Sequence, residues 1–354
     1  MIATYDELDR ARQTGDPTAD ALVSSLGREV WVVNAQLRHV RRNDERPELV
    51  PAVAAFLDDV ASHAFDAGRV ARAQAFASRH LLPITTSLFC ASLPSAYVAA
   101  QGARVLVATG RMHGAELDRR VNETARFVLD VLAEGGFGPS GSAVRAIQKV
   151  RLMHAAVRTH LIETRAITDE VPINQEDLLG TLFTFSVVVL QSLRKLGVAV
   201  SLDEARDFYH LWAAVGAMLG ISPALLPREL ADAEDLHARI QTRQARASEH
   251  GRELMLSLLD GIERHVPMAR WAPRVMIRHL IGHRLADLLG VPAADTHLMT
   301  LLPRPPRALA RMAVPWLARP LLNGIVQWKL GAKTAEFQMP ETATASTTRM
   351  TSGG

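Results

Sequence analysis

Apolar residues recur every three to four positions along most of this chain, which is the spacing of helices that bury one face. Such stripes predict helices over residues 17–42, 51–60, 70–82, part of 85–107, 110–132, 143–164, 174–195, 201–220, 232–259 and 275–289. No alternating strand pattern and no internal repeat competes with these helices. The sequence therefore predicts an all-α fold built as a single large helical domain.

The composition of the chain suggests how this domain is bounded. We expect an N-terminal helical extension over residues 1–50 and the main helical domain over residues 51–338. Residues 339–354 are rich in Thr, Ser and Gly, which is typical of a disordered tail.

Several residues mark where the predicted helices begin and end. Asn174 is placed to cap the helix that follows it, and Ser201 begins the pattern of a capping box. Gly197 and Gly220 stand where helices are expected to stop. Residues 134–142 contain Gly-x-Gly-x-x-Gly, but a helix is predicted before them, whereas a dinucleotide fingerprint requires a strand. We interpret this stretch as a connector between two helices.

The helix predicted over residues 143–164 carries the most specific chemistry. One face of it combines His154 with four apolar residues at helical spacing: Ile147, Val150, Val157 and Leu161. Arg151 and Arg158 lie three residues before and four residues after His154, so both guanidinium groups emerge on the same flank. This edge suits heme, because the histidine would ligate iron and the arginines would pair with the two propionates. The alternative is a core histidine with protein partners beside two solvated arginines.

The helix predicted over residues 110–132 places Thr124 within its apolar stripe and Arg120 at the margin of that stripe. Arg120 lies one turn before Thr124. An arginine and a threonine at such positions are costly to bury unless an acidic or polar group is buried with them. The alternative is that Arg120 pairs with Glu116 and that Thr124 bonds to its own backbone.

Other catalytic and metal-binding patterns are weaker. His279, His283 and Asp287 lie at i, i+4 and i+8, but the outer two diverge around a helix, so a metal site would need a ligand from another element. Glu234 and His237 supply one half of a helical di-iron signature that requires two. The sequence has no His-Glu-x-x-His, Gly-x-Ser-x-Gly or Gly-x-x-x-x-Gly-Lys pattern, so zinc protease, serine hydrolase and phosphate-loop functions lack support.

Charge and cysteine usage narrow the class of protein further. The formal net charge is +3, basic and acidic residues are interspersed, and aromatic residues make up only 5% of the chain. A nucleic-acid-binding protein is therefore not expected. Cys90 is the single cysteine, which rules out an internal disulfide and indicates a reducing compartment. Its apolar neighbours predict a buried, inert thiol.

The sequence also bears on location. The N-terminus lacks a basic region followed by an apolar run, so we expect no secretory signal and a cytoplasmic protein. Residues 181–190 are too short to span a bilayer, and residues 308–330 are interrupted by arginines and prolines, so no transmembrane span is expected. The tryptophans and basic residues of the second segment fit peripheral contact with a membrane, with a helix packed on the core as the alternative. Nothing in the sequence indicates an oligomeric state.

Four blocks between about residues 110 and 220 are specific in combination. They are Arg119-Arg-Val-Asn-Glu-Thr124, Arg151-Leu-Met-His-Ala-Ala-Val-Arg158, Pro172-Ile-Asn-Gln-Glu-Asp-Leu-Leu-Gly-Thr181 and Phe208-Tyr-His-Leu-Trp-x-x-Val-Gly216. Together they resemble the DUF2236 family, which comprises the rubber oxygenases called latex-clearing proteins and the fungal membrane-bound oxygenases of mycophenolic acid biosynthesis.

The resemblance implies a helical fold with a globin-like core, b-type heme and His154 as the proximal iron ligand. It also implies that Arg120 and Thr124, which match the family's Arg-x-x-x-Thr pair, hold the heme or shape its distal side. Latex-clearing proteins can place a lysine just before that threonine as a distal iron ligand, whereas this sequence has Glu123. A distal acid–base group and an exposed helix residue are the two alternatives for Glu123.

These observations lead to one expected function and two alternatives. We expect a heme b-dependent oxygenase-like enzyme that oxidises an apolar small molecule with dioxygen, by likeness at a carbon–carbon double bond of an isoprenoid or lipid. The expected catalytic residues are Glu123 and Thr124. The expected cofactor-binding residues are Arg120, Thr124, Arg151, His154, Val157 and Arg158. The alternatives are a non-catalytic heme carrier or sensor, and a heme-free helical module that binds lipid or a partner protein.

Overall fold

The structure, a computed structural model, describes residues 2–109, 114–265 and 271–292. Every named element within these ranges is helical. Within these ranges the extended pairing is limited to an isolated bridge between Ala99 and Ala245. The predicted all-α fold is therefore confirmed.

The elements follow one another along the chain with short connections. In order they are α1 (Tyr5–Arg12), α2 (Pro17–Leu26), the 3-10 turn η1 (Gly27–Glu29), α3 (Val30–Arg38), α4 (Pro51–Ala61), α5 (Ala67–Arg79), α6 (Leu81–Ser87), the π-helical turn η2 (Leu88–Ser92), α7 (Leu93–Tyr97), α8 (Ala100–Ala108), α9 (Gly114–Leu132), α10 (Ala143–Glu163), α11 (Gln175–Phe185), α12 (Val187–Lys195), α13 (Leu202–Met218), α14 (Leu230–Gln244), α15 (Glu249–His265), α16 (Trp271–Ile281) and α17 (His283–Leu288).

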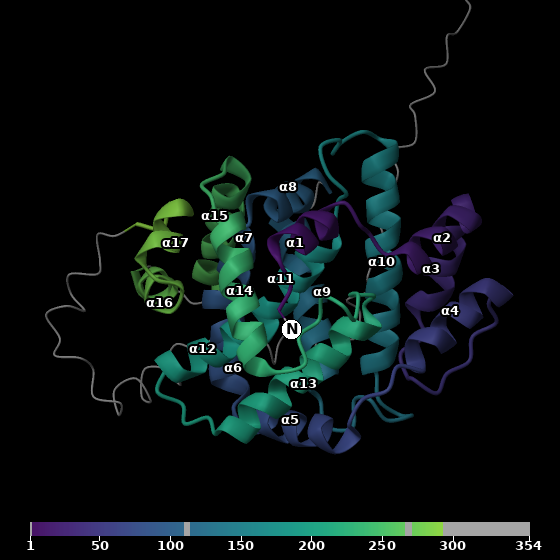
Figure 1. Cartoon of the computed structure of the whole chain (residues 1–354), viewed down its shortest axis with the longest axis horizontal. Helices are drawn as coiled ribbons and strands as arrows, with labels where there is room; N and C mark the ends of the chain where they lie inside the picture. Colours follow the sequence, from purple (N-terminus) through teal and green to yellow (C-terminus); the bar gives the residue numbers. More distant parts are fainter. Residues whose placement is uncertain (1, 110–113, 266–270, 293–354) are drawn as a thin grey trace, which may run out of the picture.

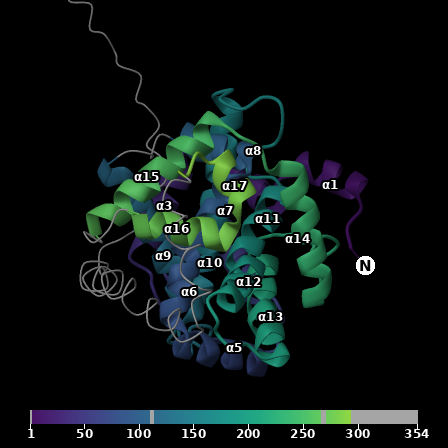
Figure 2. The ribbon, with the colours of Figure 1, turned by 90° about the vertical axis from the view of Figure 1, so that its left-hand side faces the viewer.

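Helix α10 is the long element around which the others are arranged. It packs against α2, α3, α4, α9 and α13, and Figure 1 shows α2, α3 and α4 gathered along one side of it. At one end of the molecule α5 runs along α13, while α15, α16 and α17 lie together on the side turned toward the viewer in Figure 2. Side chains from helices distant in the chain therefore surround α10.

Two large apolar clusters and one small one form the interior. The main cluster includes residues of α1 to α6 and of α9 to α14, and the second includes residues of η2, α7, α8, α12, α15, α16 and α17. Cys90 lies in the second cluster, and burial raises the pKa of its thiol to about 12. The predicted burial of this thiol is confirmed, and its inertness stays a prediction.

The chain before residue 50 contributes directly to the main cluster. Leu8, Ala19 and Leu37 are each at most 2% exposed and belong to it. The boundary expected at residue 50 stays a prediction, but the first helices are packed as part of the domain's interior. The predicted tail over 339–354 lies outside the described residues, as does the segment 308–330.

Local capping follows the sequence closely. The Asn174 side chain accepts a hydrogen bond from the backbone of Asp177, and Ser201 forms a capping box with Glu204. Ser142 stands at the N-cap position of α10, but its hydroxyl donates to Oδ1 of Asp130 at 2.8 Å and does not cap the helix. The stretch before it is a helix-to-helix connector, as predicted.

Several predicted helices are interrupted in the structure; the stretch 174–195, for example, divides at Ser186 into α11 and α12. The stretch 17–42 breaks at Gly27 and the stretch 275–289 breaks at Gly282, because both glycines adopt a positive φ, of 50° and 84°, that ends a right-handed helix. The stretch 232–259 is divided between α14 and α15, where residues 245–248 run outside both helices. A periodic apolar pattern continues across such breaks, so periodicity alone did not reveal them.

One helical stretch among the described residues passes a length and composition test for crossing a membrane. It is Gln175–Lys195, which comprises α11 and α12, and 72% of its most apolar window is buried inside the protein. A core helix passes the same test. The expectations of no transmembrane span and of a cytoplasmic location stay predictions.

A cluster of charges joins α1 to the start of α11. Arg12 forms ion pairs with Glu170 and with Oδ1 of Asp177, the latter at 3.3 Å, and lies 3.7 Å from Glu176. Burial raises the pKa of the Asp177 carboxyl to about 7, and the arginine only partly offsets this rise. The folded protein therefore retains a proton on Asp177 at pH values where the unfolded chain has released it.

This difference makes stability depend on pH in a defined direction. Because the pKa of Asp177 is 3.8 in the reference state and about 7 in the fold, the free energy of unfolding falls as pH rises between these values, by up to about 1.4 kcal/mol for each pH unit. Asp177→Asn removes this contribution. Urea unfolding from pH 4 to pH 8 should show the variant gaining stability relative to wild type as pH rises; a difference independent of pH would contradict the assignment.

Candidate functional site

The predicted apolar face of α10 is buried, and His154 lies within it. Ile147, Val150, Val157 and Leu161 are all at most 8% exposed. His154 is half-buried as a residue, while its Nδ1 atom is buried. The remaining exposure of His154 therefore comes from other atoms of the residue.

A small apolar cluster lies beside the second half of α10. Val157 and Leu161 pack there with Val105 of α8 and with Ile167, and Met153 packs against both this cluster and the main one. The residue before His154 and the residue three positions after it are thus both part of apolar packing. The surroundings of the imidazole along α10 are apolar, as the sequence predicted.

Arg151 is buried and forms a bidentate ion pair with the N-cap residue of α2. Its Nε and Nη2 atoms donate to the carboxylate of Asp16 at 2.6 Å and 3.0 Å, and both side chains are at most 6% exposed. A third donor, Nη1, is 3.4 Å from the carbonyl of Met218, and the guanidinium group lies over the ring of Phe56. All three guanidinium nitrogens therefore have protein partners.

Arg158, seven residues further along α10, binds α2 through a single nitrogen and two backbone carbonyls through the others. It forms an ion pair with Asp20, and its Nε and Nη2 atoms donate to the carbonyls of Pro172 and Ile173 at 3.0 Å and 2.8 Å. Burial raises the pKa of the Asp20 carboxyl, an effect that Arg158 opposes. Ile173 holds a φ of 52°, which is unusual for a β-branched residue and turns its carbonyl within reach of Arg158.

The two arginines lie on one flank of α10, as their spacing predicts, but their partners differ from the expected ones. The guanidinium groups that we assigned to the acid groups of a cofactor are used by Asp16, Asp20 and backbone carbonyls. The alternative of solvated arginines also fails, because Arg151 and Arg158 are at most 5% exposed. The structure assigns these arginines to the interface between α2 and α10, and direct contact with a cofactor stays a prediction that the geometry does not support.

Two glycines leave room for these ion pairs. A Cβ on Gly15 would lie 2.6 Å from Oδ2 of Asp20 and 2.8 Å from Cδ of Arg158. A Cβ on Gly220, whose φ is 85°, would collide with Asp16 and lie 2.8 Å from Nε of Arg151. The sequence indicated Gly220 only as a helix stop.

Gln175 at the start of α11 joins the two glycines. Its side-chain amide donates to the carbonyls of Gly15 and Gly220 at 2.7 Å and 2.9 Å, and its Oε1 accepts from the backbone of Ser222 at 2.7 Å. Gln175 belongs to the Pro172–Thr181 block. Two of the specific blocks, 151–158 and 172–181, therefore meet in one buried polar network that also includes the chain around residue 15.

Helix α9, which packs against α10, carries the other predicted residues. Glu123 is 3% exposed and Thr124 is half-buried. Of the two alternatives for Glu123, the exposed helix residue is therefore wrong. Arg120 lies in α9 one turn before Thr124, but its side chain lies outside the described residues, and so does that of Glu116.

The described residues contain no cluster of three or more His, Cys, Asp or Glu side chains that could hold a metal ion by themselves. At the weak metal pattern of the sequence, Gly282 separates the helices of His279 and His283, and Asp287 instead pairs with Arg278 at 2.7 Å. Glu234 likewise pairs with Arg194 at 3.0 Å, and His237 is buried, which lowers its pKa to about 4. These residues have structural partners and roles.

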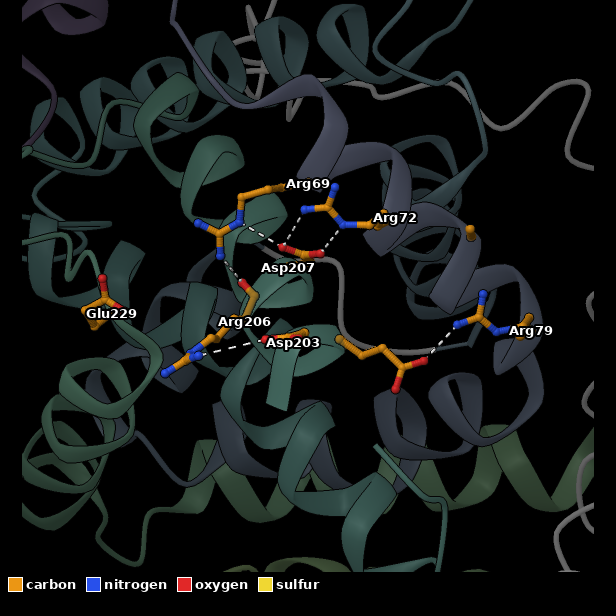
Figure 3. Close-up of a pocket in the computed structure, with 9 residues that line it drawn as sticks. Arg69, Arg72, Arg79, Asp203, Arg206, Asp207 and Glu229 are labelled. Atoms are coloured by element: carbon orange, nitrogen blue, oxygen red, sulfur yellow. Dashed lines mark hydrogen bonds and ion pairs between the residues drawn. The ribbon is translucent and has the colours of Figure 1, made fainter. Parts of the chain in front are cut away.

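The structure also has a charged cavity that the sequence analysis missed. It measures about 690 Å³, lies between α5 and the start of α13, and is lined by Arg69, Arg72, Ala75, Arg79, Asp203, Glu204, Arg206, Asp207 and Glu229 (Figure 3). None of the predicted site residues lines it. The sequence carries several arginines over residues 69–79 and several acidic residues over residues 203–207. These two groups form one site only because α5 and α13 pack together.

Ion pairs across this cavity join α5 to α13. Figure 3 shows Arg69 and Arg72 converging on Asp207, at 2.8 Å and 2.6 Å, and Arg79 pairs with Glu204 at 2.8 Å. Burial opposes ionisation of Asp207, but the hydrogen bonds from Arg72 and Arg69 hold its pKa below the usual range. The lining carries as many acidic as basic side chains. Their ion pairs stabilise the packing of α5 against α13.

The chain is similar to known proteins in sequence and in fold. Residues 79–319 match the family model described as "ER-bound oxygenase mpaB/B'/Rubber oxygenase, catalytic domain". Among curated proteins, the chain is similar to the rubber oxygenase of Streptomyces sp. (strain K30), with 26% identity over 185 residues. The match covers 50% of this chain and 45% of that protein, so the chain aligns with about half the length of this relative.

Among solved structures, the fold is similar to that of "Latex Clearing Protein LCP in the closed state". The TM-score is 0.76 at 22% sequence identity, and the superposition covers 86% of this chain and 84% of the other. This likeness shows the helical fold.

The glycine at position 220 offers a direct test of the ion pair beside it. Gly220→Ala should lower the free energy of unfolding by about 3 kcal/mol or more, because the added Cβ displaces a buried Asp16–Arg151 pair. Gly197→Ala is the control, since Gly197 has a similar φ of 75° with nothing within 4 Å of the added Cβ, and should cost only about 1 kcal/mol. Equal losses in urea unfolding would contradict a role for the ion pair.

Proposed function

This chain belongs to the family of mpaB and rubber oxygenase catalytic domains, and on that premise we propose that it is a heme b-dependent oxygenase in which His154 would hold the iron. The observation that carries the proposal is the position of His154. It is an imidazole with one buried nitrogen, on a helix whose neighbouring residues are apolar, in a domain of an oxygenase family.

The residues around His154 fit heme b in their chemistry. Heme brings four nitrogen ligands of its own, so a single imidazole completes the attachment of the iron to the protein. Since Nδ1 is buried in the packing of α10, Nε2 is the atom that we assign to the iron. Val157 and its apolar neighbours in the cluster with Val105 would provide the dry wall that a porphyrin requires.

When bound, heme b supplies the redox-active iron that activates dioxygen. The chain would contribute a dry environment and polar groups at chosen positions. We assign Glu123, whose side chain is buried, to holding or moving a proton through its carboxyl group beside the cofactor, and Thr124 to donating a hydrogen bond there. Arg120, one turn before Thr124, is assigned to the cofactor through the same helix.

The substrate proposed here is an apolar molecule with carbon–carbon double bonds, of the isoprenoid class. The support is the name of the similar Streptomyces protein, a rubber oxygenase, together with the apolar residues around His154. Cleavage of one such bond by one dioxygen gives two carbonyl groups. Both oxygen atoms then enter the products, and no external reductant is needed.

The first test is heme retention. His154→Ala should abolish bound heme, measured by the Soret absorption and a pyridine hemochrome assay on protein purified from heme-supplemented cells, while the helical circular dichroism persists. His160→Ala is the matched control, because His160 lies on the same helix, six residues further on, and is also half-buried. Full heme content in the His154 variant would remove the ligand assignment.

The second test separates an enzyme from a heme carrier or sensor. The heme-loaded protein should consume dioxygen with squalene, an isoprenoid with double bonds, and not with squalane, its saturated counterpart of the same carbon skeleton. An oxygen electrode measures the uptake, and carbonyl products are detected with a hydrazine reagent. A normal heme spectrum without uptake on any unsaturated isoprenoid would favour the carrier, and a colourless wild-type protein would favour the heme-free module.

A further inference from the structure

The helix that carries His154 is held by the N-terminal segment of the chain. Asp16 caps α2 by accepting a hydrogen bond from the backbone of Ala19 at 3.2 Å, and the same carboxylate binds Arg151 through two hydrogen bonds. Asp20, one turn further along α2, accepts from the backbone of Asp16 at 3.0 Å and binds Arg158. The first turn of α2 is therefore joined to α10 at two points.

These two points lie on either side of His154. Arg151 and Arg158 are seven residues apart, which is about 10.5 Å along a helix, and the imidazole lies between them. A shift of α10 by one residue would turn it by about 100° and move it by about 1.5 Å, which no bidentate ion pair tolerates. Buried charges that lose their partners are strongly disfavoured, so the pairs oppose both sliding and rotation of α10.

We propose that Asp16 and Asp20 are positioning residues of the cofactor site: through Arg151 and Arg158 they set the position of α10, and thereby the direction in which His154 presents its ring. This inference rests on the proposed function. The N-terminal segment, which the sequence analysis treated as an extension of the domain, is by this inference part of the site.

The packing around the pairs supports the inference. Gly15 and Gly220 approach the paired atoms so closely that a Cβ on either would collide with them. Gln175 donates to the carbonyls of both glycines, so the segment before α2 is also bound by the first residue of α11. An N-terminal extension that merely covered the domain would not require this close approach of three separate segments.

The test compares Asp16→Asn with a control that removes the same charge elsewhere. Asp207→Asn is matched, because Asp207 is also a buried carboxylate that accepts hydrogen bonds from guanidinium groups, but those of Arg69 and Arg72, so it joins α5 to α13 and does not contact α10 through its ion pairs. Proteins loaded with hemin are mixed with excess apomyoglobin, and hemin transfer is followed by the Soret band. The urea midpoint of each variant is measured in parallel.

The inference predicts that Asp16→Asn releases hemin at least about tenfold faster than wild type, as is usual when a group that orients a metal ligand is removed. Asp207→Asn should release it at the wild-type rate even where its urea midpoint falls as far. The ferric spectrum should also change in Asp16→Asn alone, because a displaced imidazole alters the spin state of the iron and a uniform loss of stability does not.

Asp20→Asn keeps the test decisive if Asp16→Asn fails to fold. The Asp20 side chain is 30% exposed, so its removal leaves Arg158 nearer to solvent and to its two carbonyl partners. It should show the same faster release. Wild-type release rates in both aspartate variants, or equal acceleration in Asp207→Asn, would overturn the inference.

A wild-type protein that takes up no hemin would refute the proposed function. The role of the ion pairs in positioning α10 is then tested by a second measurement. Hydrogen exchange of the backbone amides of residues 150–158 is then compared in the heme-free proteins. Faster exchange there in Asp16→Asn than in Asp207→Asn would support the role of the ion pair in holding α10. Equal exchange in the two variants would overturn it.

Discussion

The buried pairing of Asp16 with Arg151 is the interaction on which the arrangement of this protein depends. A buried arginine without a partner is costly, so α10 can occupy the centre of the domain only if a carboxylate is brought to it. That carboxylate comes from the N-cap of α2, which requires the chain before α2 to run past Gly220 and Gln175. The position of α10, and with it that of His154, is linked to the first twenty residues.

This constraint explains why the specific blocks of the sequence lie where they do. The block around His154 supplies the arginines, the block at 172–181 supplies two carbonyls and Gln175, and the block at 208–216 lies on α13, which ends shortly before Gly220. The first two blocks contribute side-chain and backbone atoms to one polar network, which Gln175 connects to Gly220 beyond the end of α13. Two of the blocks by which the sequence resembles its family, 151–158 and 172–181, are thus joined by the buried network.

The fold class and much of α10 were predictable because the relevant signals are local. The apolar spacing of Ile147 to Leu161 depends on the geometry of one helix, and the caps at Asn174 and Ser201 depend on three neighbouring residues. The partners of Arg151 and Arg158 were not predictable in this way, since Asp16 and Asp20 lie more than 130 residues before them in the chain. The charged cavity between α5 and α13 was missed for the same reason. The burial of Glu123 was left undecided because helical spacing does not say which faces of α9 are covered.

The central claim is that a nitrogen of His154 binds the iron of heme. An anomalous difference map at the iron absorption edge, from crystals of the hemin-loaded protein, tests this most directly because it locates the metal without assuming its ligand. The account predicts one iron peak at bonding distance from Nε2 of His154, with Asp16 and Asp20 still paired to Arg151 and Arg158. An iron peak bonded to a different residue, or hemin held away from α10, would contradict it.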